Sequence, residues 1–259
     1  MKILLITDIH YGANTNYPHF KGEDYINVYG EEFENLIQRL HSKMKKCDLV
    51  INLGDFIHDE NAEKDIDAYK KAMKLITNGT PVKHVLGNHD IRNITRENWC
   101  QLVGEQKSYY SFNMGEYHHV VLDGNRNRLD PNSILLIDDE QLKWLANDIA
   151  NTNLLVIVYD HFPLYNQNLE DNIYFKDIPE RAIVSNWREI QEVFEKSKKV
   201  LAVFSGHTHF FGEEIINGIH YLTVPSFTEN DGTHKPQAKY AIASLSREKV
   251  NIEIKKIDF

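Results

Sequence analysis

Polar side chains that can bind metals follow five apolar segments of this 259-residue chain, at the point where each segment ends. In two of these groups the side chains are two residues apart, so both leave the same side of an extended segment. Carboxylate, imidazole and amide groups of this kind suit the coordination of a divalent metal and proton transfer beside it. The groups are Asp8 with His10, Asp55, Asn88 with His89 and Asp90, Asp160 with His161, and His207 with His209.

Each group alone has a structural explanation. An Asp after a strand is usually a turn or helix-capping residue, and a single His is more often a surface residue or a hydrogen-bonded core residue. Five such groups, each at the end of a separate apolar segment, are not explained in this way. Because ligands bind where the carboxyl ends of parallel strands meet, we expect the five groups to converge.

The residue types also indicate which metals fit. The set has no thiolate, which excludes a structural thiolate zinc site and suits Mn, Fe, Zn or Co. Seven ligands exceed one tetrahedral site, but they form two four-ligand sites if one carboxylate bridges, and Asp55 follows a central segment. The seven candidates are Asp8, His10, Asp55, Asn88, His161, His207 and His209.

The pattern along the chain predicts the elements that position these groups. Strand-length apolar runs alternate with amphipathic helical patterns, which indicates βαβ units and a mostly parallel sheet. The expected strands are 3–7, 49–53, 82–86, 154–159 and 200–204, and the expected helices are 31–46, 62–76, 139–150 and 186–197. Further strand pairs read as hairpins, at 109–112 with 118–122, 213–216 with 219–224, and 240–245 with 250–257. Asn217-Gly218, between the second pair, is a strong hairpin-turn signal.

Taken together, the five groups resemble the signature of the calcineurin-like metallophosphoesterase superfamily. That signature is Asp-x-His, Gly-Asp, Gly-Asn-His-Asp/Glu, His, and Gly-His-x-His, and every block is intact between residues 8 and 209. The resemblance implies an α/β fold, a four-layer αββα sandwich of two mixed β-sheets flanked by helices. It also implies a single domain over residues 1–259.

The resemblance further implies two divalent metal ions per chain. Carried over by position, the first would be held by Asp8, His10, Asp55 and His209, and the second by Asp55, Asn88, His161 and His207. A hydroxide bridging the metals would attack a phosphate ester in line. His89 would then serve the leaving group, and Asp90 would hold the His89 imidazole in orientation.

Departures from the family pattern narrow the expected branch. Purple acid phosphatases have a Tyr ligand where this chain has His58, and Ser/Thr protein phosphatases have an Arg in the second block that is missing here. The run His161-Phe162-Pro163 resembles small bacterial cyclic-nucleotide phosphodiesterases, although those often have a His where this chain has Asp160. We expect a dinuclear phosphohydrolase that acts on a small phosphodiester or a nucleotide.

Substrate contacts have a weaker basis in the sequence. Arg92 and Arg96 follow the His89 block, and Arg is a favoured phosphate partner, although both equally suit a solvated helix face. His58 is a further candidate, with a plain turn residue as the alternative. Three long polar loops, 12–29, 124–133 and 166–179, are either functional or surface variation.

Composition limits the partners. Asp and Glu number 38 against 29 Lys and Arg, a formal charge of −9, which disfavours nucleic acid and anionic membranes. A nuclease of the same superfamily is therefore a secondary alternative, as are a phosphomonoesterase, a pyrophosphohydrolase and a non-enzymatic scaffold. No apolar run approaches the ~18 residues of a membrane span. The two cysteines, Cys47 and Cys100, favour a cytoplasmic protein. The oligomeric state has no signature in the sequence.

Overall fold

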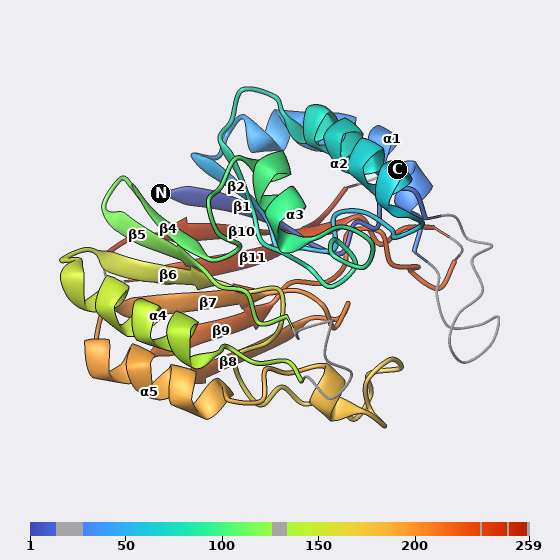
Figure 1. Ribbon diagram of the computed structural model, residues 1–259. Coiled ribbons are helices and arrows are strands. Elements are labelled where there is room, and N and C mark those ends of the chain that lie inside the picture. The colour runs from blue at the N-terminus through green and yellow to red at the C-terminus, as the bar shows by residue number, and fades with distance from the viewer. Residues whose placement is uncertain (14–27, 126–133, 234, 248, 258–259) are drawn as a thin grey trace.

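Two β-sheets pack face to face, and helices cover both outer faces (Figure 1). The computed structural model describes residues 1–13, 28–125, 134–233, 235–247 and 249–257. The predicted loops 12–29 and 124–133 therefore fall largely outside the described residues, whereas 166–179 is described throughout. The four layers are those that the family resemblance implies.

The first sheet has five strands in the order β11-β10-β1-β2-β3. Strands β1, β2 and β3 run parallel, and β10 pairs antiparallel with the other side of β1. Strand β1 is thus central, and its carboxyl end leads directly into Asp8. The bounds are β1 (Lys2–Ile6), β2 (Leu49–Asn52), β3 (Val82–His84), β10 (Lys239–Leu245) and β11 (Val250–Lys256).

The second sheet has six strands in the order β4-β5-β6-β7-β9-β8. Strands β5, β6, β7 and β9 are parallel, and β4 and β8 close the two edges as antiparallel strands. The Asn217-Gly218 turn between β8 and β9 has positive φ at both residues, as its sequence predicts. The bounds are β4 (Tyr110–Met114), β5 (Tyr117–Val121), β6 (Leu155–Tyr159), β7 (Val200–Ser205), β8 (Gly212–Ile216) and β9 (Ile219–Thr223).

Helices complete the outer layers. Helices α1 (Phe33–Met44), α2 (Ala62–Ile76) and α3 (Arg96–Val103) lie on the side of the first sheet, and α4 (Asp139–Asn151) and α5 (Trp187–Ser197) on that of the second (Figure 1). Helix α3 is absent from the sequence prediction, although Thr95 caps its first turn. No helix in the described part of the chain combines the length and apolar character needed to cross a bilayer.

The apolar core explains why the central strands are hydrophobic throughout. On β1, Ile3 and Leu5 face the second sheet, whereas Leu4 and Ile6 face the helices. Successive side chains point to opposite faces, and both faces are buried, so no position on the strand is free to be polar. Strand β3 is shorter than its apolar run, because the chain leaves the sheet after His84 and carries the buried residues Val85 and Leu86 towards the sheet edge.

His118 and His119, successive residues on β5, support the fold and point to opposite faces. His118 Nε2 lies 2.7 Å from Asp148 Oδ2 on α4. The His119 ring stacks between Phe112 and Tyr159, and its Nδ1 lies 2.9 Å from the Tyr159 hydroxyl. These contacts give both histidines a structural role.

We expect His119 to weaken the fold at acid pH. Burial and the neighbouring His118 lower the pKa of His119 to about 4, from an ordinary value of 6.5. As the pH falls through this window the unfolded chain binds a proton that the folded chain does not, so stability is lost. Between pH 6.5 and 5 the wild type should lose up to about 2 kcal/mol more unfolding free energy than His119→Gln, measured by urea unfolding. Equal losses in the two proteins would contradict this assignment.

Candidate metal centre

The loops after β1, β2, β3, β6 and β7 meet at one edge of the two sheets. Backbone bonds join them directly: Asp8 N donates to Gly54 O over 3.1 Å, and Gly206 N donates to His161 O over 2.9 Å. The structure therefore brings together groups that are up to about two hundred residues apart in the chain.

Five of the seven ligand candidates have a left-handed backbone. Asp8, His10, Asp55, His207 and His209 have φ between 47° and 66°, among eight such non-glycine residues in the described chain. This conformation is uncommon for residues with a side chain and costs about 1–3 kcal/mol each. Such strain persists only where surrounding contacts enforce it, and it concentrates at functional sites.

Glycines allow two of the loops to approach the carboxylates closely. A Cβ on Gly206 would collide with Thr7 Oγ1 and lie 2.8 Å from Asp8 Oδ2. A Cβ on Gly87 would collide with both the backbone nitrogen and the Oδ1 of Asp55. Residues 87 and 206 must therefore be glycine, because any larger side chain would collide with the loops that carry Asp55 and Asp8.

Asp8, His10 and His209 form the first group of candidate ligand atoms, all within 4.8 Å of one another. His209 Nε2 lies 3.4 Å from Asp8 Oδ1 and 3.3 Å from His10 Nε2. Ligands about 2.1 Å from a tetrahedral metal lie about 3.4 Å apart, so these spacings suit one ion.

Asp55, His161 and His207 form the second group, also within 4.8 Å. Asp55 Oδ2 lies 3.4 Å from His161 Nε2 and 4.0 Å from His10 Nε2 of the first group. The other oxygen, Asp55 Oδ1, accepts the backbone N–H of His89 over 2.7 Å. One oxygen of Asp55 thus faces both groups, as a bridging ligand must.

Contacts behind three of the four candidate ligand histidines fix which ring nitrogen each presents, whereas His10 Nδ1 has no hydrogen-bond partner in the described chain. His161 Nδ1 lies 2.8 Å from Leu53 O, and His207 Nε2 lies 2.9 Å from Arg181 O. His209 Nδ1 lies 2.6 Å from Glu229 Oε2. Since each acceptor takes the N–H of that nitrogen, the other nitrogen is the one that a metal would bind in place of a proton.

The electrostatics of the site favour a bound cation. Burial opposes a charge on His209 and His161, but Asp8 raises the pKa of His209 to about 10 and Asp55 raises that of His161 to about 9. Burial lowers the pKa of His207 to about 3. Within the described chain, Asp8 Oδ1 and His161 Nε2 are buried without a hydrogen-bond partner. Divalent metals would satisfy these atoms and supply the missing positive charge, so the residues fit the group.

Asn88 lies beside this arrangement. The N–H of Gly87 donates to Asp90 Oδ2 and that of His89 to Asp55 Oδ1, which places residue 88 next to the second group. Its assignment as a ligand stays a prediction.

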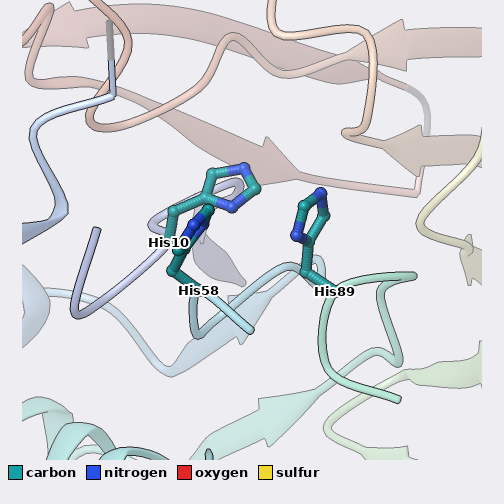
Figure 2. A group of neighbouring side chains, drawn as sticks. All are labelled: His10, His58 and His89. Atoms are coloured by element: carbon teal, nitrogen blue, oxygen red, sulfur yellow. The ribbon is translucent and has the colours of Figure 1, made fainter. Parts of the chain in front are cut away.

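At the rim of the centre, His89 lies with His58 beside His10, which also belongs to the first ligand group (Figure 2). The Nδ1 of His89 contacts Asp59 Oδ1, and Arg92 Nη2 lies 3.2 Å from its Nε2. The His89 ring is stacked on His58 at 5.8 Å and lies edge-on to His10 at 4.7 Å between centroids. His10, His58 and His89 are themselves close enough to form a third group of ligand atoms.

The orienting role expected of Asp90 is wrong for this structure. Asp90 is fully buried, and its carboxylate accepts the backbone N–H groups of Phe56, Ile57 and Gly87. It therefore fixes the loops after β2 and β3 to each other. Asp59 contacts His89 instead, which the sequence did not predict although Asp59 lies only four residues after Asp55.

Replacing Asp59 with Asn should lower kcat by about 10–100-fold, the range typical of losing the outer partner of a functional His. The amide keeps the size of the side chain but removes the charge that holds His89 and Arg92. Hydrolysis of a chromogenic phosphate ester with Mn²⁺ measures the effect. Glu60→Gln, at the exposed neighbouring position, is the control, and an unchanged kcat in Asp59→Asn would refute the role.

The two arginines predicted to contact the substrate have different surroundings in the structure. Arg92 Nη1 lies 3.3 Å from Asp59 Oδ2, so Arg92 is attached to the His89 cluster. Arg96 instead donates to Asp123 over 2.7 Å and to Asn125 O over 3.0 Å. These contacts join α3 to the loop after β5, and they do not support the substrate role expected of Arg96.

A family model named calcineurin-like phosphoesterase matches residues 1–211. The chain belongs to the calcineurin-like phosphoesterase family. This region contains all seven ligand candidates and His89, and it is most of the chain. This match confirms the superfamily resemblance of the five groups. Glu229, which contacts His209, lies beyond the matched region.

The names of relatives of this phosphoesterase specify several different activities. A manganese-dependent ADP-ribose/CDP-alcohol diphosphatase from Arabidopsis thaliana is 27% identical over 73% of this chain and 73% of its own length. The serine/threonine-protein phosphatase CPPED1 from Homo sapiens is 25% identical over 68% of this chain and 58% of its own. A probable cyclic nucleotide phosphodiesterase from Psychrobacter sp. is 22% identical over 75% of this chain and 56% of its own. Protein phosphatases, which the missing Arg disfavours, are thus among the relatives.

A solved structure supports the fold of this phosphoesterase. A dimetal phosphatase from Danio rerio superposes with a TM-score of 0.74 and 18% identity, covering 98% of this chain and 95% of its own. At this identity the likeness concerns the fold.

Proposed function

We propose that this phosphoesterase is a dinuclear metal-dependent hydrolase of small nucleotide substrates. The observation that carries the proposal is the position of Asp55 Oδ2, which faces His161 of one ligand group and His10 of the other. Asp8, the other carboxylate of the two groups, lies within 4.0 Å of an imidazole nitrogen only at His209, so among the described residues Asp55 alone is shared in this way.

Under this proposal Asp8, His10, Asp55 and His209 hold one ion, and Asp55, Asn88, His161 and His207 hold the other. The bound ions would supply a nucleophile from water at neutral pH and neutralise charge on the phosphoryl oxygens. Thr7 Oγ1 and His207 N donate to Asp8 Oδ2 and leave its Oδ1 directed at the first group.

The leaving group is served by the cluster at the rim. His89 stands within ring contact of His10, so it lies close to the first ligand group. Asp59 holds Nδ1, and Nε2, which faces Arg92 in this structure, would carry the proton for the departing oxygen once Arg92 binds the substrate phosphate. Arg92 adds a cation beside it that can bind a second phosphate or an ester oxygen.

Charge and relatives support a small substrate. Two divalent ions with Asp8 and Asp55 leave a local charge near +2, or about +1 with Glu229 counted. This attracts one or two phosphates, while the net charge of −9 repels long polyanions. The names of the diphosphatase and the cyclic nucleotide phosphodiesterase both specify substrates in which a phosphate is linked to two groups, as a diphosphate or a phosphodiester. We propose the same substrate class, a nucleotide phosphodiester or diphosphate, for this chain.

A substrate panel tests the proposal. The metal-stripped protein is assayed with Mn²⁺, Fe²⁺, Zn²⁺ or Mg²⁺ against a cyclic nucleotide, ADP-ribose, aryl mono- and diesters, a phosphopeptide and single-stranded DNA. Metal-stimulated hydrolysis of the cyclic nucleotide or ADP-ribose is expected, with slower cleavage of the monoester. Preference for the monoester, phosphopeptide or DNA would overturn the substrate class, and no metal-stimulated hydrolysis of any substrate would overturn the enzymatic function.

A further inference from the structure

A buried carboxylate, Glu229, lies directly behind one ligand histidine. Its Oε2 lies 2.6 Å from His209 Nδ1 and accepts the Tyr174 hydroxyl over 2.8 Å. The residue is 3% exposed, so this charge is shielded from water and its two partners are firmly held. Glu229 belongs to none of the five motif groups.

The backbone around Glu229 is tied to the same loop that holds Asp8. Glu229 N donates to Ser226 Oγ over 3.0 Å, and Ser226 Oγ donates to Asp8 O over 2.8 Å. Gln237 N donates to Glu229 O over 2.6 Å. The carboxylate therefore has a fixed position relative to the first ligand group.

Tyr174 approaches from the long polar segment 166–179. Its ring lies 5.1 Å from the His209 ring, so the side chain packs on the histidine as well as bonding to Glu229. In the same segment, Asn172 Nδ2 donates to Thr208 O over 2.9 Å, between the two histidines of the last motif. The segment thus fastens the strained turn that carries His207 and His209.

The two ligand groups differ in the contacts behind their histidines, and the difference lies at His209, since His10 Nδ1 has no hydrogen-bond partner in the described chain. Behind His161 and His207 stand backbone carbonyls, of Leu53 and Arg181. Behind His209, by contrast, stands a full negative charge. A carboxylate behind a ligand histidine raises the basicity of the ring and adds attraction for a cation, and its loss typically costs 10–100-fold in metal affinity.

We propose that Glu229, positioned by Tyr174, makes the group of Asp8, His10, Asp55 and His209 the tighter of the two metal sites. Glu229 and Tyr174 are positioning residues, since neither belongs to the proposed ligand sets. The inference rests on the proposed two-metal function and adds an order of filling: the first ion enters the group that Glu229 supports.

Mn²⁺ titration of the metal-stripped full chain tests this, with free Mn²⁺ followed by electron paramagnetic resonance. The wild type should bind two ions with unequal affinity. Glu229→Gln should weaken the tighter site by about 10–100-fold and leave the weaker site within about twofold. Tyr174→Phe keeps the ring but removes the hydroxyl, and should weaken the same site by about threefold to tenfold.

Asp148→Asn is the matched control, because Asp148 pairs with a buried His outside the centre at 2.7 Å. It should leave both Mn²⁺ affinities unchanged. Unaltered affinities in Glu229→Gln, or equal weakening of both sites, would overturn the inference. If Glu229→Gln fails to fold, as thermal melting will reveal, Tyr174→Phe decides by the same criterion. A wild type that binds no Mn²⁺ would instead overturn the proposed function.

Discussion

Replacing Asp55 with Ala should reduce metal-stimulated hydrolysis by more than about 1,000-fold, since it removes a ligand from both ions at once. Asp55 Oδ2 faces His10 on one side and His161 on the other, and Asp55 Oδ1 holds the backbone of His89. The substitution therefore separates the two ligand groups and loosens the residue that serves the leaving group. kcat/KM on the best substrate of the panel, measured with saturating Mn²⁺, gives the loss.

Asp65→Asn provides the control for this substitution. Asp65 is also a buried carboxylate, and it accepts backbone N–H groups at the start of α2. Its loss should lower thermal stability and leave kcat/KM nearly unchanged. An Asp55→Ala protein that retains a tenth of the wild-type activity would refute a bridging role.

Replacing His89 with Ala should lower kcat by about 10²–10⁴-fold, the usual contribution of a general acid. Mn²⁺ stoichiometry should stay at the wild-type value, because His89 belongs to neither of the proposed four-ligand sets. The loss should be largest for a substrate with a poor alkoxide leaving group and smallest for a nitrophenyl ester, whose leaving group needs no proton. Comparing the two substrates separates proton donation from simple positioning.

His220→Ala is the control for a histidine loss. His220 stands on β9 opposite Ala202, away from the carboxyl end of β7 where His207 and His209 follow. Its replacement should change neither kcat nor metal content. Equal losses on both leaving groups in His89→Ala would contradict proton donation, and loss of an ion would indicate a ligand role.

The ligand groups could be predicted from sequence because strand topology determines where strand ends meet. Once β1, β2 and β3 are parallel, Asp8 and Asp55 must leave the first sheet at the same edge. The glycines follow from the same logic, since a loop can pass Asp8 or Asp55 closely only where no Cβ intervenes. Neither inference needs the side-chain conformations.

The outer contacts could not be predicted, because loop paths decide them. Asp90 adjoins His89 in sequence, but three backbone N–H groups orient its carboxylate into the protein, and Asp59 reaches His89 instead. Glu229 lies 20 residues beyond His209 in an irregular segment, so no spacing links the two. Helix α3 has only eight residues and buries only Trp99 and Cys100, too few to establish a helical period.

We expect two metal ions to share Asp55. Anomalous diffraction from crystals soaked in Mn²⁺ tests it most directly. Two peaks about 3.5–4 Å apart, on either side of the Asp55 carboxylate, are predicted. A single peak, or a peak among His10, His58 and His89 in place of one of the pair, would contradict the account.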